Sequence, residues 1–185
     1  MGLLPGLRLR MGVAGRGPVP ADFPTMTTNV RVAMHALREA LAALHSTSDL
    51  TAGGAAVGTA AFWACALDEQ LRAAEPGAYD ARRDASEDGA VLPGLRLVRN
   101  AVTHGAVVAV QKAPGMVFPI RFPMEFSHLA YRPLEDVLAS WVGMRDRRKD
   151  NARQDAVYRS AVEGLQLSAP LTRALRWFEH ATSEG

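Results

Sequence analysis

Apolar residues recur at alternating steps of four and three positions between residues 28 and 45, which is the spacing of one face of an α-helix. A second run of apolar and small residues predicts another helix over about 55–74, with side chains small enough for a neighbouring helix to approach closely. Two such faces can be buried only against further helices, so the pattern predicts a helical bundle. The two repeats are Val30, Met34, Leu37, Leu41 and Leu44, and Val57, Ala60, Ala64, Leu67 and Leu71.

Further helices are predicted over about 93–104, from Pro133, through the charged run 145–159, and from Ser168. The apolar period changes after the helix 93–104, where three of the residues 106–110 are β-branched valines and Pro114-Gly115 fits the centre of a type II turn. Phe118, Ile120 and Phe122 then alternate with other residues as in a strand, and residues 125–132 are expected to be a linker. The predicted fold is mainly α: a four- to five-helix bundle with a β-hairpin at about 106–123, directly after the helix 93–104.

Residues 1–24 are rich in glycine, proline and arginine and have no helical or strand period, so we expect a flexible basic arm followed by a single helical domain, 25–185. The arm contains three arginines and one aspartate, which account for the whole formal charge of +2. Because the domain is then neutral, RNA would be contacted locally rather than by a large basic surface.

The sequence contains no CxxC or HExxH pattern, no P-loop and no GxGxxG, and we therefore expect neither a metal nor a cofactor. Cys65 is the only cysteine and cannot form an internal disulfide. No apolar run is expected to approach the roughly 20 residues that span a bilayer. These features favour a cytoplasmic protein without membrane contact.

The helix over 93–104 is predicted to have one chemically unusual face. Its apolar residues fall in one narrow sector, and Gly105 fits the position that follows a helix end, which places His104 in the last turn. An arginine that can bind phosphate and a histidine that can move a proton are the minimum set for cleaving RNA without a metal. The opposite sector gathers Arg96, Arg99, Asn100, Thr103 and His104.

The stretch Arg99-Asn100-x-x-x-His104 resembles the Arg-x4–6-His motif of the HEPN domain superfamily, in which a polar residue commonly follows the arginine. The resemblance implies a small helical bundle, usually a homodimer, and in many members a metal-independent endoribonuclease of toxin–antitoxin, phage-defence or RNA-processing systems. It also implies that Arg99 and His104 are the catalytic pair and that Asn100 positions them. Arg96 and Thr103, on the same face, are expected to bind RNA.

The expected reaction is attack of a ribose 2′-hydroxyl on the adjacent phosphate, with a cyclic phosphate as product. An alternative is a non-catalytic helical dimer that binds a nucleotide or a partner protein such as an antitoxin. In a third interpretation, Arg99 is structural and pairs with a carboxylate such as Glu39 or Asp68. The charged run 145–159 is interpreted as a salt-paired solvated face, with Asp150–Arg153 as one pair and residues 145–149 as an alternative phosphate contact.

Overall fold

The structure is a computed structural model that describes residues 28–112, 128–142 and 150–183. Within these ranges the chain is mainly α-helical with one β-hairpin, which confirms the predicted fold class. The predictions for residues 1–24, 113–127 and 145–149 lie outside the described residues. The elements are α1 (Thr28–Ser46), α2 (Leu50–Ala74), α3 (Ala78–Ala85), the short 3-10 helix η1 (Gly89–Val91), α4 (Leu92–Thr103), β1 (Ala109–Lys112), β2 (His128–Tyr131), α5 (Leu134–Ala139), α6 (Asp150–Ala161) and α7 (Ser168–Ser183).

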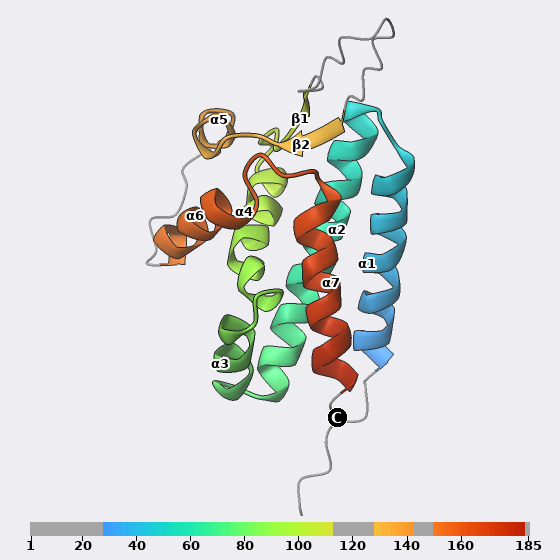
Figure 1. Cartoon of the computed structure of the whole chain (residues 1–185), viewed down its shortest axis with the longest axis vertical. Helices are drawn as coiled ribbons and strands as arrows, with labels where there is room; N and C mark the ends of the chain where they lie inside the picture. Colours follow the sequence, from blue (N-terminus) through green and yellow to red (C-terminus); the bar gives the residue numbers. More distant parts are fainter. Residues whose placement is uncertain (1–27, 113–127, 143–149, 184–185) are drawn as a thin grey trace, which may run out of the picture.

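The helices α1, α2, α4 and α7 lie alongside one another as a bundle, with the hairpin at one end and α3 at the other (Figure 1). Helix α2 contacts α1, α4 and α7. All five residues of the predicted α1 repeat are buried, and Ala60 and Ala64 of α2 are fully buried. The apolar periodicity therefore identified the faces that form the core.

Helix α2 begins at Leu50, although residues 46–54 are expected from composition to form a loop. The carboxylate of Asp49 caps the helix by accepting a hydrogen bond from the Ala52 N–H at 2.7 Å. Two consecutive glycines, Gly53 and Gly54, lie in the first turns of the helix and are more typical of a loop, so the sequence does not indicate where α2 begins. Gly53 packs closely against Leu129 there, and an added Cβ would displace the end of the Leu129 side chain.

The hairpin pairs β1 with β2 in antiparallel register, from Ala109 opposite Tyr131 to Lys112 opposite His128. A hairpin after the motif helix is therefore confirmed, but its second strand lies at 128–131, within the expected linker. Backbone hydrogen bonds join this strand to the chain before α7 as well, from Tyr131 N–H to the Leu165 carbonyl. Three of the four β2 residues are buried, so the strand lacks the alternating pattern that identifies a strand in a sequence.

Helix α6 packs closely against α4 at Gly94. An added Cβ at this position would lie 2.9 Å from Cγ2 of Val162 and 3.2 Å from the backbone nitrogen of Tyr158. Trp177 of α7 is expected to lie off the buried stripe, but it is only 4% exposed, and its Nε1–H donates to the Tyr79 hydroxyl at 3.1 Å. A partner for the indole N–H makes this burial possible.

Helix α2 is long and apolar enough to cross a membrane by length and composition alone, with a mean hydropathy of 1.5 over 18 residues. The expectation that no apolar run approaches such a length is therefore wrong. The same composition also suits the central helix of a bundle, and α2 buries the carboxylate of Asp68 among arginines. The cytoplasmic location stays a prediction.

Candidate functional site

Helix α4 carries the residues of the proposed motif on its less buried side, while Leu95 and Val98 on the other side are fully buried. The helix ends as predicted, because Gly105 has a φ of 75°. The N–H groups of Gly105 and Ala106 donate to carbonyls of the last helical turn at 3.0 and 2.9 Å, which forms a Schellman motif. This ending fixes His104 as the capping residue of α4.

His104 is exposed and is held by the segment that follows α5. Its ring stacks on Trp141, with the ring centroids 5.5 Å apart and the planes at 23°. The backbone N–H of Val142 also donates to the His104 carbonyl at 3.2 Å. Among the described residues, none forms a hydrogen bond with the imidazole nitrogens of His104, so they are open to a ligand.

Arg99 leans from α4 towards α2, where its Nη2 lies 3.7 Å from a carboxylate oxygen of Glu69. The Arg99 side chain is 29% exposed, and its Nε is buried without a hydrogen-bond partner in the described part of the chain. A contact of 3.7 Å with a half-exposed carboxylate is weak. Arg99 and His104 therefore contact different neighbours, Glu69 on α2 and Trp141 after α5.

The other three residues of the predicted face have separate environments. Arg96 donates from Nη2 to the buried carboxylate of Asp68 at 2.6 Å. The Thr103 hydroxyl donates to the Arg99 carbonyl at 2.8 Å. Asn100 is half-buried between these residues on α4. On α4, Arg96 pairs with Asp68, and Arg99 does not form the pair with Asp68 that the structural interpretation of the motif expects.

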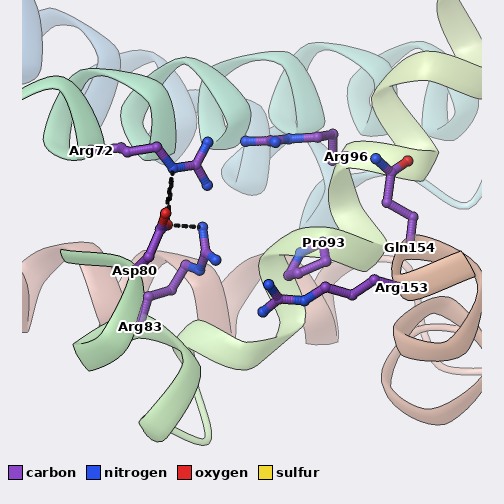
Figure 2. Close-up of a pocket in the computed structure, with 7 residues that line it drawn as sticks. All are labelled: Arg72, Asp80, Arg83, Pro93, Arg96, Arg153 and Gln154. Atoms are coloured by element: carbon purple, nitrogen blue, oxygen red, sulfur yellow. Dashed lines mark hydrogen bonds and ion pairs between the residues drawn. The ribbon is translucent and has the colours of Figure 1, made fainter. Parts of the chain in front are cut away.

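A cavity of about 270 Å³ lies beside the first half of α4, and we call it the arginine cavity. Four elements contribute to it: α2, α3, α4 and α6. Figure 2 shows the guanidinium groups of Arg72 and Arg96 pointing towards each other on one side, with those of Arg83 and Arg153 across from them. The lining residues are Arg72, Asp80, Arg83, Pro93, Arg96, Arg153 and Gln154.

The buried carboxylate of Asp68 holds three of these arginines in place. Its Oδ2 accepts from Nη2 of Arg72 at 3.2 Å and from Nη2 of Arg96 at 2.6 Å. Its Oδ1 accepts from Nη1 of Arg83 and from the Tyr79 hydroxyl, both at 3.1 Å. Four donors use the full accepting capacity of one carboxylate, so Asp68 fixes the geometry of the cavity from beneath.

Two more aspartates complete the charge network. Asp80 lies 2.9 Å from Nε of Arg72 and 2.8 Å from Nη1 of Arg83, and Asp84 lies 2.8 Å from Nη2 of Arg83 and 2.6 Å from Nη2 of Arg153. Burial works to lower the pKa of Arg83, but Asp68 and Asp84 outweigh it and raise that pKa. Burial would raise the pKa of the Asp84 carboxyl, but hydrogen bonds from Arg153 and Arg83 lower it. Both groups are therefore held in their charged forms.

Sequence reasoning placed Arg96 on the functional face but missed most of the arginine cavity. The spacing predicts the Asp68–Arg72 pair, which the structure confirms at 3.2 Å. Arg83 and Arg153 come from α3 and α6, and no local pattern indicates that these helices meet α4. Across the described residues, no cluster of histidine, cysteine, aspartate or glutamate side chains is arranged to hold a metal ion.

Comparison of the chain with protein-family models, curated proteins and solved structures finds no match. The resemblance to HEPN domains therefore rests on the motif in α4 alone.

Proposed function

We propose that the protein is a HEPN-like, metal-independent endoribonuclease whose reaction takes place at the C-terminal end of α4. The proposal rests on one observation: an exposed imidazole and a weakly paired guanidinium lie five positions apart on one helix. The stack on Trp141 supports this role for His104, because it orients the ring without using its nitrogens. The partly exposed guanidinium of Arg99, whose contact with Glu69 is loose, supports a role in binding an anion.

In the proposed reaction, His104 accepts the proton of a ribose 2′-hydroxyl as that oxygen attacks the adjacent phosphorus. Arg99 stabilises the negative charge that develops on the phosphorane. The bond from phosphorus to the 5′-oxygen then breaks, the leaving oxygen takes a proton, and a 2′,3′-cyclic phosphate remains. Asn100 orients the reacting groups, while Arg96 and Thr103 contact the RNA on either side of them.

We further propose that the protein acts as a homodimer, as the resemblance implies. Two copies of α4 in one cleft would supply a second imidazole to protonate the leaving oxygen. The exposed apolar side chains of Val107 and Val142 lie close in sequence to His104 and Trp141 and support a contact between copies at this end. Sedimentation equilibrium tests this part of the proposal, and a monomeric mass at micromolar concentration contradicts it.

The activity is tested by incubating the full chain with end-labelled RNA in excess chelator. We expect cleavage products that end in a cyclic phosphate, and no cleavage when the ribose at the cut site is replaced by 2′-deoxyribose. The deoxy substrate is the matched control, because it lacks only the attacking hydroxyl. Failure to cleave any RNA, or equal cleavage of the deoxy substrate, contradicts the proposal.

A further inference from the structure

The arginine cavity has more donors than its own carboxylates use. An arginine side chain carries five N–H donors, yet among the side chains that the structure describes Arg96 bonds only to Asp68 and Arg153 pairs only with Asp84. In both contacts the arginine uses Nη2 alone, which leaves Nε and Nη1 for other partners. Arg72 likewise uses Nε and Nη2 and leaves its Nη1 free. These donors belong to a cavity and not to a flat surface.

A second polar group in the cavity is also unused. Gln154 lines it from α6 and is only 7% exposed (Figure 2). Its amide has no hydrogen-bond partner in the part of the chain that the structure describes. Although most of the Gln154 side chain is buried, its amide atoms remain accessible from the cavity. The amide is therefore available as a donor and an acceptor for a ligand bound there.

The charges in and beneath the cavity favour an anion. Four guanidinium groups face three carboxylates, Asp68, Asp80 and Asp84, so one positive charge remains uncompensated. Asp80 also lines the cavity, and its carboxylate is held by Arg72 and Arg83, so the donors that remain belong mainly to Arg96 and Arg153. Guanidinium groups bind phosphate oxygens in bidentate geometry and do so best when other contacts fix them in advance.

We propose that the arginine cavity binds a phosphate monoester, with Arg96 and Arg153 on the phosphate oxygens and Gln154 bonded to the ester or the adjoining sugar. The volume of about 270 Å³ is near the lower end of the range for small-molecule sites. That size suits a phosphate with a small organic group, such as a nucleoside monophosphate. The same chemistry is presented by the 5′-phosphate at the end of an RNA chain.

The proposal is tested by calorimetric titration of the full chain with adenosine monophosphate, inorganic phosphate and adenosine. We expect adenosine monophosphate to bind and adenosine not to bind. Arg153→Gln is expected to weaken binding by at least about tenfold, because it removes a hydrogen bond to a charged group. Gln154→Ala is expected to weaken it by about fivefold, because the hydrogen bond that it removes is to a neutral group. Arg153 is half-exposed, so its substitution leaves the fold intact. Arg31→Gln, on an exposed position of α1, is the matched control and is expected to bind like the parent.

Two short RNAs that differ only in a 5′-phosphate or a 5′-hydroxyl distinguish the sources of the ligand. A preference for the phosphorylated RNA that Arg153→Gln removes assigns the cavity to RNA ends, whereas tight binding of the free nucleotide alone assigns it to a small molecule. Equal binding of adenosine and adenosine monophosphate, or binding that neither substitution changes, overturns the proposal. Because His104→Ala does not touch the cavity, loss of the nuclease proposal leaves this result unaffected.

Discussion

Arg83 of α3 and Asp68 of α2 form a buried ion pair, with Nη1 of the arginine 3.1 Å from Oδ1 of the aspartate. Their side chains are 4% and 3% exposed. The pair ties the end of the bundle to its central helix, and the same carboxylate also fixes Arg72 and Arg96 of the arginine cavity. Stability and the candidate phosphate site therefore depend on one side chain.

Replacing Asp68 by asparagine is expected to lower the free energy of unfolding by about 3 kcal/mol, because it leaves buried guanidinium charge uncompensated. Glu69→Gln is the matched control at the next position, where the side chain is 54% exposed and its contact with Arg99 is loose. That change is expected to cost less than about 1 kcal/mol. Urea unfolding measures both values, and equal losses in the two variants would contradict the central role of Asp68.

Asp88 is expected to make stability depend on pH in the acid range. Its carboxylate accepts from Nε and Nη2 of Arg176 at 2.9 and 2.8 Å, and these hydrogen bonds lower the pKa of Asp88 in the folded protein. A lowered folded pKa contributes stability above the unfolded pKa of about 4, and this contribution is lost as pH falls through the folded pKa. Asp88→Asn should therefore be less stable than the parent near neutral pH.

The same difference should shrink as the pH falls through the lowered pKa that Asp88 has in the folded protein, because below it both proteins carry an uncharged group at position 88. Thermal unfolding followed by circular dichroism at several pH values checks this. A difference in Tm that stays constant from neutral to acid pH would show that Asp88 contributes by packing and not by charge.

Gly94→Ala is expected to destabilise the protein by about 1–3 kcal/mol, because the new Cβ presses on α6 at Val162 and on the backbone of Tyr158. Gly54→Ala is the matched control in α2, where an added Cβ meets no atom within 4 Å. Alanine favours a helix over glycine, so this control should gain up to about 1 kcal/mol. Opposite signs of the two changes in urea unfolding are the expected result. A gain in stability in both variants would contradict the close contact between α4 and α6 at Gly94.

Cys65 is expected to resist alkylation in the native protein. It is 2% exposed, and burial raises the pKa of its thiol to about 12 even though Arg99 and Arg96 act in the other direction. Because the thiolate is the reactive form, iodoacetamide at mildly alkaline pH should label the chain only after urea unfolding. Rapid labelling of the folded protein, measured by mass spectrometry, would show that α2 separates from α4.

The sequence predicts the fold where one physical pattern dominates. The α1 repeat is buried throughout, and Gly105 has the positive φ that its place after α4 requires. The second hairpin strand is missed, because Leu129, Ala130 and Tyr131 are all buried and show no alternation. The start of α2 is missed because Gly53 serves packing against Leu129 and not a loop.

The candidate site is predictable only along single helices. Spacing predicts the Asp68–Arg72 pair and the positions of Arg99 and His104 on α4, but it does not indicate which neighbours these side chains meet. It does not indicate that Arg153 of α6 contacts Asp84 of α3 at 2.6 Å. Contacts between helices depend on tertiary packing, which spacing within one helix does not specify.

The proposed nuclease is tested most directly by the single-turnover rate of RNA cleavage in excess chelator, measured for the parent, His104→Ala and His35→Ala. His35 is an exposed histidine of α1 and serves as the matched control. We predict that His104→Ala lowers the rate by about 10²–10³-fold, that His35→Ala leaves it unchanged, and that all three proteins have the same circular dichroism spectrum. Equal rates for the parent and His104→Ala would contradict the account.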